Sequence, residues 1–232
     1  MVYVTGDFHG EYKRFGTAEY KKLKKGDTLI VCGDFGFLWQ NDKKEQKILK
    51  KIGAQKFYTV FVPGCHDNYE ALAEYPIEEW RGGKVRVLSG NLMQLCRGEV
   101  YFLEGKTFFA FGGGESQDAS LREEQGLWWP EEQPSEEEEA YALSRLEEHG
   151  NKVDYIITHD APLSICEFLG LPPVNVNSRI NNFLEKIGKT IEFKRWFFGK
   201  LHMDKGITVR HQAVYLKVLP VETDETGKCK RH

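Results

Sequence analysis

The sequence predicts an α/β protein whose first part alternates strands and helices and whose middle part consists of antiparallel strands. Short apolar runs that end at turn residues are typical of buried parallel strands. Three such runs span 2–7, 28–34 and 56–64. Charged stretches with helical character lie between them, at 13–25 and 41–52. This alternation of strand and helix favours a parallel sheet with crossover helices.

The middle of the chain has a different pattern. Apolar runs separated by tight glycine turns occupy 84–90, 92–105 and 106–114, and they predict consecutive antiparallel strands. They are followed by a long irregular excursion over 115–134, which is rich in acidic residues and contains a pair of tryptophans.

A helix is expected directly after this excursion. Ser135 is a favourable N-cap residue, and Glu138 three residues later completes a capping box. Gly150 ends the helix, because glycine readily adopts the left-handed backbone of a C-terminal cap. The remaining apolar runs predict the last strands, at 152–160, 195–202 and 207–220.

Length and composition narrow the class of protein. With 232 residues, the chain is long enough for one large core, so we predict a single domain over 1–222 and a flexible tail over 223–232. Lysine and arginine total 32 against 35 acidic residues, a net charge of −3, which does not indicate nucleic-acid binding. No segment is long enough to span a bilayer. The five cysteines form no CxxC pair, so we expect a cytoplasmic protein without a disulfide framework.

Acidic and imidazole side chains follow five of the predicted strands. Since the carboxyl ends of strands in an open α/β sheet converge on one crevice, we expect these side chains to lie close together. Four of the seven histidines are at such positions. Carboxylate oxygen combined with imidazole nitrogen suits manganese, iron or zinc. The residues at the strand ends are Asp7, His9, Asp34, Cys65, His66, His159 and His202.

These strand ends resemble the calcineurin-like metallophosphoesterases. "GDFHG", "GD", "GCHD", "THDAP" and "FFGKLHMD" follow, in order, the family pattern GDxHG, GDxxD, GNH[DE], a lone histidine and GHxH. The resemblance covers roughly residues 2–220. "GLWWPEEQPSEEE" resembles a block found before the capped helix in small bacterial and phage members.

The resemblance implies a four-layer αββα sandwich of two mixed β-sheets flanked by helices. It also implies a centre of one or two divalent metals (Mn, Fe or Zn) that hydrolyses a phosphate mono- or diester. Carried over position by position, Asp7, His9 and His202 bind the first metal, Asp34 bridges, and His159 binds the second.

The catalytic residues are predicted in the same way. His66 corresponds to the histidine that contacts the phosphate and the leaving group, and Asp67 is expected to hold it. The resemblance implies a phosphate-ester substrate, either a small molecule or a phosphoprotein. The excursion itself, rather than the resemblance, makes Arg122 a candidate phosphate contact. Trp128 and Trp129 either form a wall over the pocket or pack in the core against the neighbouring helix, which is the commoner role of a tryptophan pair.

Three positions depart from the family pattern. Cys65 stands where the family has asparagine, and Lys200 stands where it has the first histidine of GHxH. Both family residues bind the second metal. Phe37 replaces the second aspartate of GDxxD. The residues expected around the first metal are all present, so the changes are confined to one side of the site.

These departures leave three interpretations open. In one, Cys65 is a thiolate ligand for zinc or iron, and Lys200 swings aside or binds the substrate phosphate. In another, the Lys200 ammonium replaces the second metal, stabilising charge without generating hydroxide. In the third, the protein is a catalytically impaired module that binds a metal or phosphate ligand. A covalent cysteine mechanism is not indicated, because cysteine phosphatases need an arginine six residues after the thiol, where this chain has Ala71.

Overall fold

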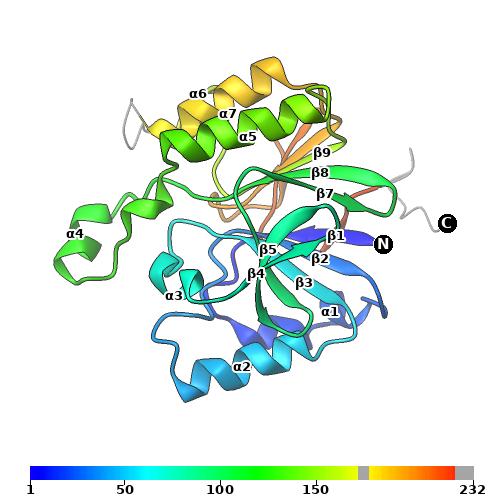
Figure 1. The fold of residues 1–232 in the computed structure, drawn as a ribbon, viewed down its shortest axis with the longest axis vertical. Coiled ribbons are helices and arrows are strands. Elements are labelled where there is room, and N and C mark those ends of the chain that lie inside the picture. Colours follow the sequence, from blue (N-terminus) through cyan, green and yellow to red (C-terminus); the bar gives the residue numbers. More distant parts are fainter. Residues whose placement is uncertain (172–177, 223–232) are drawn as a thin grey trace.

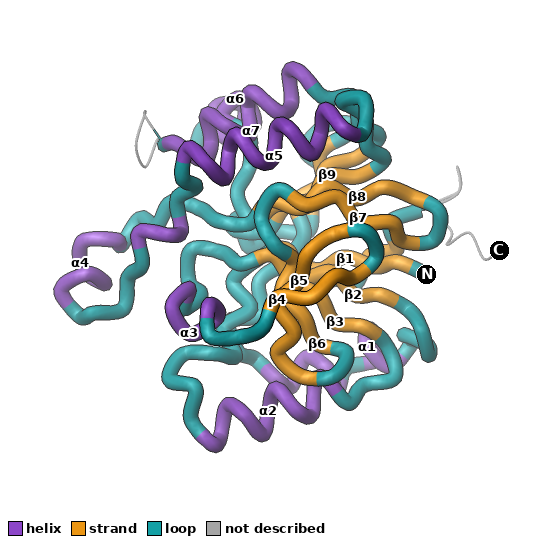
Figure 2. The backbone as a smooth tube through the Cα atoms, viewed as in Figure 1, coloured by secondary structure: helices purple, strands orange, loops and turns teal. Residues whose placement is uncertain are grey.

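The computed structural model describes residues 1–171 and 178–222, and within them two mixed β-sheets pack face to face (Figures 1 and 2). The predicted αββα sandwich is confirmed. Helices cover the outer face of each sheet, with α2 on one side of the molecule and α5 and α7 on the other (Figure 1). The predicted tail at 223–232 lies outside the described residues.

The first sheet has seven strands in the order β13-β1-β2-β3-β6-β5-β4. Strands β1, β2, β3 and β6 run parallel to their neighbours in this series, and β5 and β4 continue the sheet antiparallel. The strands are β1 (Val2–Thr5), β2 (Thr28–Cys32), β3 (Tyr58–Val62), β4 (Ile77–Trp80), β5 (Gly83–Ser89), β6 (Leu92–Leu95) and β13 (Leu219–Pro220).

The second sheet has six strands in the order β11-β12-β10-β9-β8-β7. Strands β8, β9, β10 and β12 are parallel, and β7 and β11 close the two edges antiparallel. The strands are β7 (Glu99–Leu103), β8 (Lys106–Phe111), β9 (Tyr155–Thr158), β10 (Arg195–Phe198), β11 (Lys205–Gly206) and β12 (His211–Ala213).

The alternation of side chains along each strand builds the layers. In β2, Ile30 points into the apolar cluster between the sheets, whereas Leu29 and Val31 face the outer cluster beneath the helices. In β8, Phe108 likewise faces the other sheet and Phe109 faces the outer helices. Successive residues of a strand point to opposite faces of its sheet. Because these strands are apolar at every position, both faces of each sheet need apolar neighbours, which are the other sheet on one face and helices on the other.

The helices agree only in part with the sequence expectations. α2 (Lys43–Gly53) and α5 (Glu136–Glu148) are present, and α5 has the predicted capping box. The helix expected over 13–25 is instead a 3-10 turn, η1 (Tyr12–Gly16), followed by the short α1 (Ala18–Lys21).

The interruption has a local cause. Gly16 ends the 3-10 turn, and Thr17 has an extended backbone (φ −78°, ψ 164°), so one continuous helix cannot form. The excursion 115–134 contains two short helical segments and extends away from the sheets in Figure 1. The strands β4 and β11 were not predicted. The same is true of five helical elements, namely α3 (Tyr69–Ala73), α4 (Ala119–Glu124), η2 (Pro130–Glu132), α6 (Leu163–Phe168) and α7 (Arg179–Thr190).

No helix in the described ranges is both long enough and apolar enough to cross a membrane.

We predict that Ser135→Ala lowers the free energy of unfolding by about 1 kcal/mol, because it removes the N-cap of α5. The Ser135 hydroxyl accepts from the Glu138 amide at 3.2 Å, and the Glu138 carboxylate accepts from the Ser135 amide at 2.9 Å. Urea denaturation measures the change. Ser144→Ala on the same helix is the control, since Ser144 only donates to a carbonyl one turn earlier. Equal stability of the two variants would contradict the prediction.

Candidate metal centre

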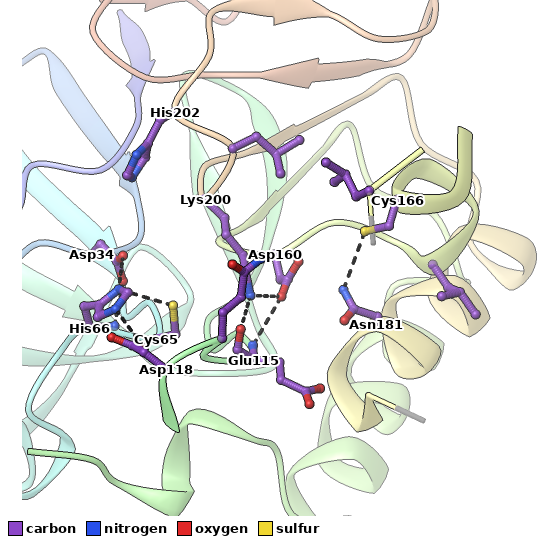
Figure 3. A pocket seen from close by; sticks show the side chains of 14 residues that line it. Asp34, Cys65, His66, Glu115, Asp118, Asp160, Cys166, Asn181, Lys200 and His202 are labelled. Carbon is purple, nitrogen blue, oxygen red and sulfur yellow. Dashed lines mark hydrogen bonds and ion pairs between the residues drawn. The ribbon is translucent and has the colours of Figure 1, made fainter. Parts of the chain in front are cut away.

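The candidate site lies where parallel strands of the two sheets end. Asp7 follows β1, Asp34 follows β2, and Cys65 and His66 follow β3 in the first sheet. His159 directly follows β9, and Lys200 and His202 follow β10 in the second sheet. Figure 3 shows Asp34, Cys65, His66, Lys200 and His202 around one pocket. The structure therefore brings together the strand-end residues that the sequence singles out.

Two buried carboxylates form the floor of the site. Asp7 and Asp34 are only 1% and 2% exposed. Between them lies the fully buried imidazole of His159, with Nδ1 3.2 Å from Asp7 Oδ1 and Nε2 3.4 Å from Asp34 Oδ1. His159 Nδ1 donates to the Cys32 carbonyl at 3.0 Å, which leaves Nε2 to face the site. A backbone partner on one ring nitrogen commonly orients the other toward a metal.

One oxygen of this floor lacks a partner. Asp7 Oδ2 is buried and has no hydrogen-bond partner among the described residues. An unpaired buried carboxylate oxygen costs free energy, whereas a cation beside it would offset that cost. His202 Nε2 lies 3.7 Å from this oxygen. This geometry fits a metal ion at the position that the family resemblance implies.

Two imidazoles close the same position from the pocket side. His9 Nε2 and His202 Nε2 are 3.0 Å apart, and His9 Nε2 is 3.7 Å from Asp34 Oδ2. The His202 ring stacks on Tyr215, with ring centroids 4.8 Å apart. Asp7, His9, Asp34 and His202 thus supply neighbouring carboxylate and imidazole donors, a set that suits manganese, iron or zinc. Among the described residues, the three ligand atoms on this side that are close enough to one another to hold an ion come from His9, Asp34 and His66.

Backbone strain is concentrated at this point. His9, Asp34, Lys200 and His202 all have left-handed φ angles, between 44° and 60°. Such conformations cost of order 1 kcal/mol each for residues other than glycine, and they persist where the surrounding structure or a ligand fixes them. Their presence in four residues of one site supports a functional arrangement.

A second group of donors adjoins the first. Cys65 Sγ lies 3.5 Å from His159 Nε2, and Asp34, Cys65 and His159 are close enough to hold one metal ion. Burial and Asp34 raise the pKa of the Cys65 thiol, but contacts with His159 and His66 outweigh them and the net shift is downward. A thiol with a lowered pKa is more readily the thiolate that binds metals.

Lys200 has a counter-ion that the sequence reasoning missed. Its Nζ donates to Asp160 Oδ2 at 2.6 Å and to the Glu115 carbonyl at 2.5 Å, whereas its backbone amide donates to Asp7 Oδ1 at 3.2 Å. Burial lowers the pKa of Lys200, but the Asp160 carboxylate outweighs burial and raises it overall. Asp160 follows His159 directly in the chain. The lysine at a position where the family has histidine could have indicated this pair, because a buried ammonium needs an acidic partner.

His66 is held by Asp34. The His66 amide donates to Asp34 Oδ1 at 2.8 Å, and His66 Nδ1 donates to Asp34 Oδ2 at 2.9 Å. The hydrogen bond to Asp34 raises the pKa of His66 to about 10. His66 Nε2 lies 3.5 Å from Asp118 Oδ1, and the imidazole lines the pocket.

Asp67 was expected to hold His66, but in the described part of the chain Asp34 does so. The Asp67 carboxylate instead accepts backbone amides from Gly64 (2.8 Å), Gly36 (2.9 Å) and Phe35 (3.2 Å). Asp67 therefore joins the loops that follow β2 and β3, and both loops carry site residues.

Residues of the excursion 115–134 hydrogen-bond to a loop of the site, and Arg122 does so without lining the pocket. Arg122 is 7% exposed, and it donates to the Cys65 carbonyl at 2.8 Å and to the Leu127 carbonyl at 2.7 Å. It also donates to the hydroxyl of Ser116, which is bonded to buried Glu132. The role of Arg122 as a phosphate contact stays a prediction.

Of the two roles considered for the tryptophans, the pocket wall is not the one observed, because neither occurs among the described residues that line the pocket. Trp129 packs against Trp39 instead, with ring centroids 5.7 Å apart. Trp128 has a buried indole nitrogen with no hydrogen-bond partner in the described part of the chain. The pair therefore belongs to the packing of the excursion rather than to the wall of the pocket.

Arg14 is a further residue that the sequence reasoning missed. Its buried guanidinium donates to the Asp7 carbonyl, to Thr5 Oγ1 at 3.0 Å and to the Tyr215 carbonyl at 2.6 Å. It also lies over the Phe8 ring, 4.1 Å from its centroid. Arg14 therefore fixes the turn that presents Asp7 and joins it to the loop of Tyr215. In the sequence it appears as one basic residue among many, so no local signal marked it.

Residues 1–202 match the calcineurin-like phosphoesterase family, and the chain belongs to that family. It is therefore a member of a class of metal-dependent phosphoesterases, as its sequence motifs predict. None of the curated proteins compared with the chain matches it.

Two solved structures are similar in outline. One is a phosphopantetheinyl hydrolase from Mycobacterium tuberculosis, with 17% identity and a TM-score of 0.42, covering 92% of this chain and 89% of that one. The other is a protein of unknown function from Aquifex aeolicus, with 16% identity and a TM-score of 0.37, covering 83% and 87% respectively.

We predict that Arg14→Leu lowers the free energy of unfolding by roughly 3 kcal/mol, because it leaves several buried acceptors without a donor. Chemical denaturation measures this loss. Arg210→Ala is the control, since Arg210 is exposed and its guanidinium lies over the ring of Phe193. We expect the control to change stability by no more than about 0.5 kcal/mol. A similar small change in Arg14→Leu would show that the network is not important for stability.

Proposed function

We propose that the protein hydrolyses phosphate esters with two metal ions, one held by Asp7, His9, Asp34 and His202 and the other by Asp34, Cys65 and His159. The observation that carries the proposal is the buried Asp7 Oδ2, which has no hydrogen-bond partner in the described part of the chain and lies 3.7 Å from His202 Nε2. A cation beside that oxygen would satisfy it and would offset negative charge on both carboxylates.

The contacts of Cys65 and Lys200 support a thiolate ligand over a lysine that replaces the metal. Cys65 Sγ is in reach of His159 Nε2, as a shared ligand position requires. The Lys200 ammonium is bound to Asp160, so its charge is already compensated. We therefore propose zinc or iron for the second position, because both accept mixed sulfur and nitrogen donors.

The roles of the chain's own groups follow from their positions. When bound, the metals supply a water of lowered pKa, which falls from ~15.7 toward ~7 in favourable sites, and positive charge beside the phosphate. His66 is one-third exposed toward the pocket, and Asp34 orients its ring. We propose that His66 donates a proton to the leaving oxygen of the ester. Arg122 keeps His66 in place by holding the Cys65 carbonyl.

The substrate enters a pocket of about 500 Å³ beside the donors. This volume falls within the range of small-molecule sites, which is roughly 300–1,000 Å³. We therefore propose a small-molecule phosphate ester as the substrate. Lys200 lines the pocket (Figure 3), and we propose that its ammonium donates a hydrogen bond to the phosphate while it remains paired with Asp160.

Metal content tests the two-metal proposal directly. After loading with zinc or iron and desalting, we expect elemental analysis to find about two metals per chain, one for each donor group. Cys65→Ala should lower the content to about one, whereas Cys166→Ala, which removes a pocket cysteine outside the donor groups, should not. One metal in the unaltered protein would instead favour Lys200 as the replacement for the second metal.

The role of His66 has its own test. We predict that His66→Ala retains the metals but lowers turnover of a phosphate ester by about 10²–10⁴, the range of general acid catalysis. Elemental analysis and steady-state kinetics on the same preparation separate the two effects. His149→Ala serves as the control, because His149 lies at the end of α5. If His66→Ala loses metal in proportion to activity, His66 is a ligand rather than an acid.

A further inference from the structure

The pocket beside the donors has two chemically different halves (Figure 3). Asp34, Cys65, His66 and His202 form the half next to the metal position. The other half lies toward α6 and α7, and Lys200 with Asp160 and Glu115 stands between the two. The described residues of this second half are Leu163, Cys166, Leu171, Asn181 and Leu201.

The second half is aliphatic and uncharged. Three of its five described residues are leucines, all of them only partly buried, so their side chains retain surface for a ligand. The Asn181 side chain does not offer its amide nitrogen to a ligand, because Nδ2 donates to the Ala161 carbonyl at 2.7 Å. Burial of such aliphatic surface favours an apolar group.

The charges of the pocket disfavour an anionic group in this half. Lys200 is the one lysine or arginine among the described lining residues, and Asp160 neutralises it. Glu115 adds an acidic side chain between the two halves (Figure 3), and Asp118 adds one beside His66, with Asp118 Oδ1 3.5 Å from His66 Nε2. A second phosphate or a carboxylate on the substrate would therefore meet negative charge without an unpaired cation.

A nucleobase is disfavoured for another reason. Bases are commonly held by stacking on aromatic side chains. Apart from the imidazoles at the metal position, no aromatic ring occurs among the described lining residues, and Trp129 is occupied with Trp39. The pocket thus offers a stacking surface to neither a purine nor a pyrimidine in its described part.

We infer that the alcohol portion of the substrate is an uncharged aliphatic group that binds against Leu163, Leu171 and Leu201. This inference rests on the proposed function, because it assumes that the phosphate occupies the metal half. Hydrolysis would then release a neutral aliphatic alcohol and inorganic phosphate or, from a diester, a phosphate monoester, with water supplying the oxygen and the protons.

The test compares methyl, butyl and hexyl phosphate as substrates of the metal-loaded protein. Each methylene buried against the leucines should raise kcat/KM about fourfold, because burial of a CH₂ contributes ~0.8 kcal/mol. Calorimetry with methyl- and hexylphosphonate gives a readout that does not need turnover, and the same preference is expected in their dissociation constants. Adenosine monophosphate serves as the aromatic competitor and should be a poorer substrate than hexyl phosphate.

Variants of α6 locate the effect. Leu163→Asp should abolish most of the preference for hexyl over methyl compounds, and Leu163→Ala should weaken it with less risk to folding. Phe168→Ala is the matched control on the same helix, because Phe168 is 70% exposed and is not among the described lining residues. It should keep the full preference.

The outcomes separate this inference from the proposed function. Turnover of all three esters without a chain-length preference would overturn the inference and leave the proposed function standing. No turnover combined with tighter binding of hexylphosphonate would overturn the proposed function and support the aliphatic half of the pocket. Equal weakening by the Leu163 and Phe168 variants would also overturn the inference.

Discussion

The arrangement of the site depends on two carboxylates, Asp7 and Asp34, that are buried together at the ends of neighbouring parallel strands. Like charges in a poorly hydrated space repel, and each carboxylate also loses its hydration. Two glycines let the backbone approach this pair closely. A Cβ on Gly64 would lie 2.1 Å from Asp34 Oδ1, and one on Gly199 would lie 2.7 Å from Asp7 Oδ1. Loops from both sheets therefore close around the charges. The neighbouring imidazoles compensate them in part, and a bound metal ion would compensate them further.

Lys200 alters this balance on one side only. A cation at a family ligand position adds positive charge to the second-metal side, and Asp160 removes its net effect by pairing with it. Asp160 is buried and the Lys200 side chain is only 16% exposed, so separating the two would leave a poorly hydrated charge without its partner. This coupling explains why a lysine can be accommodated here while Cys65 and His159 keep their place next to Asp34. It also divides the pocket into a polar half and an aliphatic half.

The sequence predicted the site residues that lie directly at the ends of apolar strands. Apolar runs that end in Asp or His are readable because parallel strands share one carboxyl edge, so Asp7, Asp34 and His159 could be placed together without a structure. The helix expected over 13–25 failed because Thr17 is extended, and α7 was missed despite buried residues such as Ile180. Contacts between segments distant in sequence, such as Arg14 with Tyr215 or Arg122 with Cys65, leave no periodic signal.

The strained backbone and the buried charges lead to a common consequence for stability. His9, Asp34 and His202 adopt left-handed conformations at the same point where Asp7 Oδ2 lacks a partner. Each of these features raises the free energy of the folded chain, and each would be offset by an ion bound between these side chains. A ligand that binds only the folded state stabilises it by mass action. Ion binding and folding would thus depend on the same side chains, because the unpartnered Asp7 oxygen and the left-handed donors are the features that a bound ion would offset.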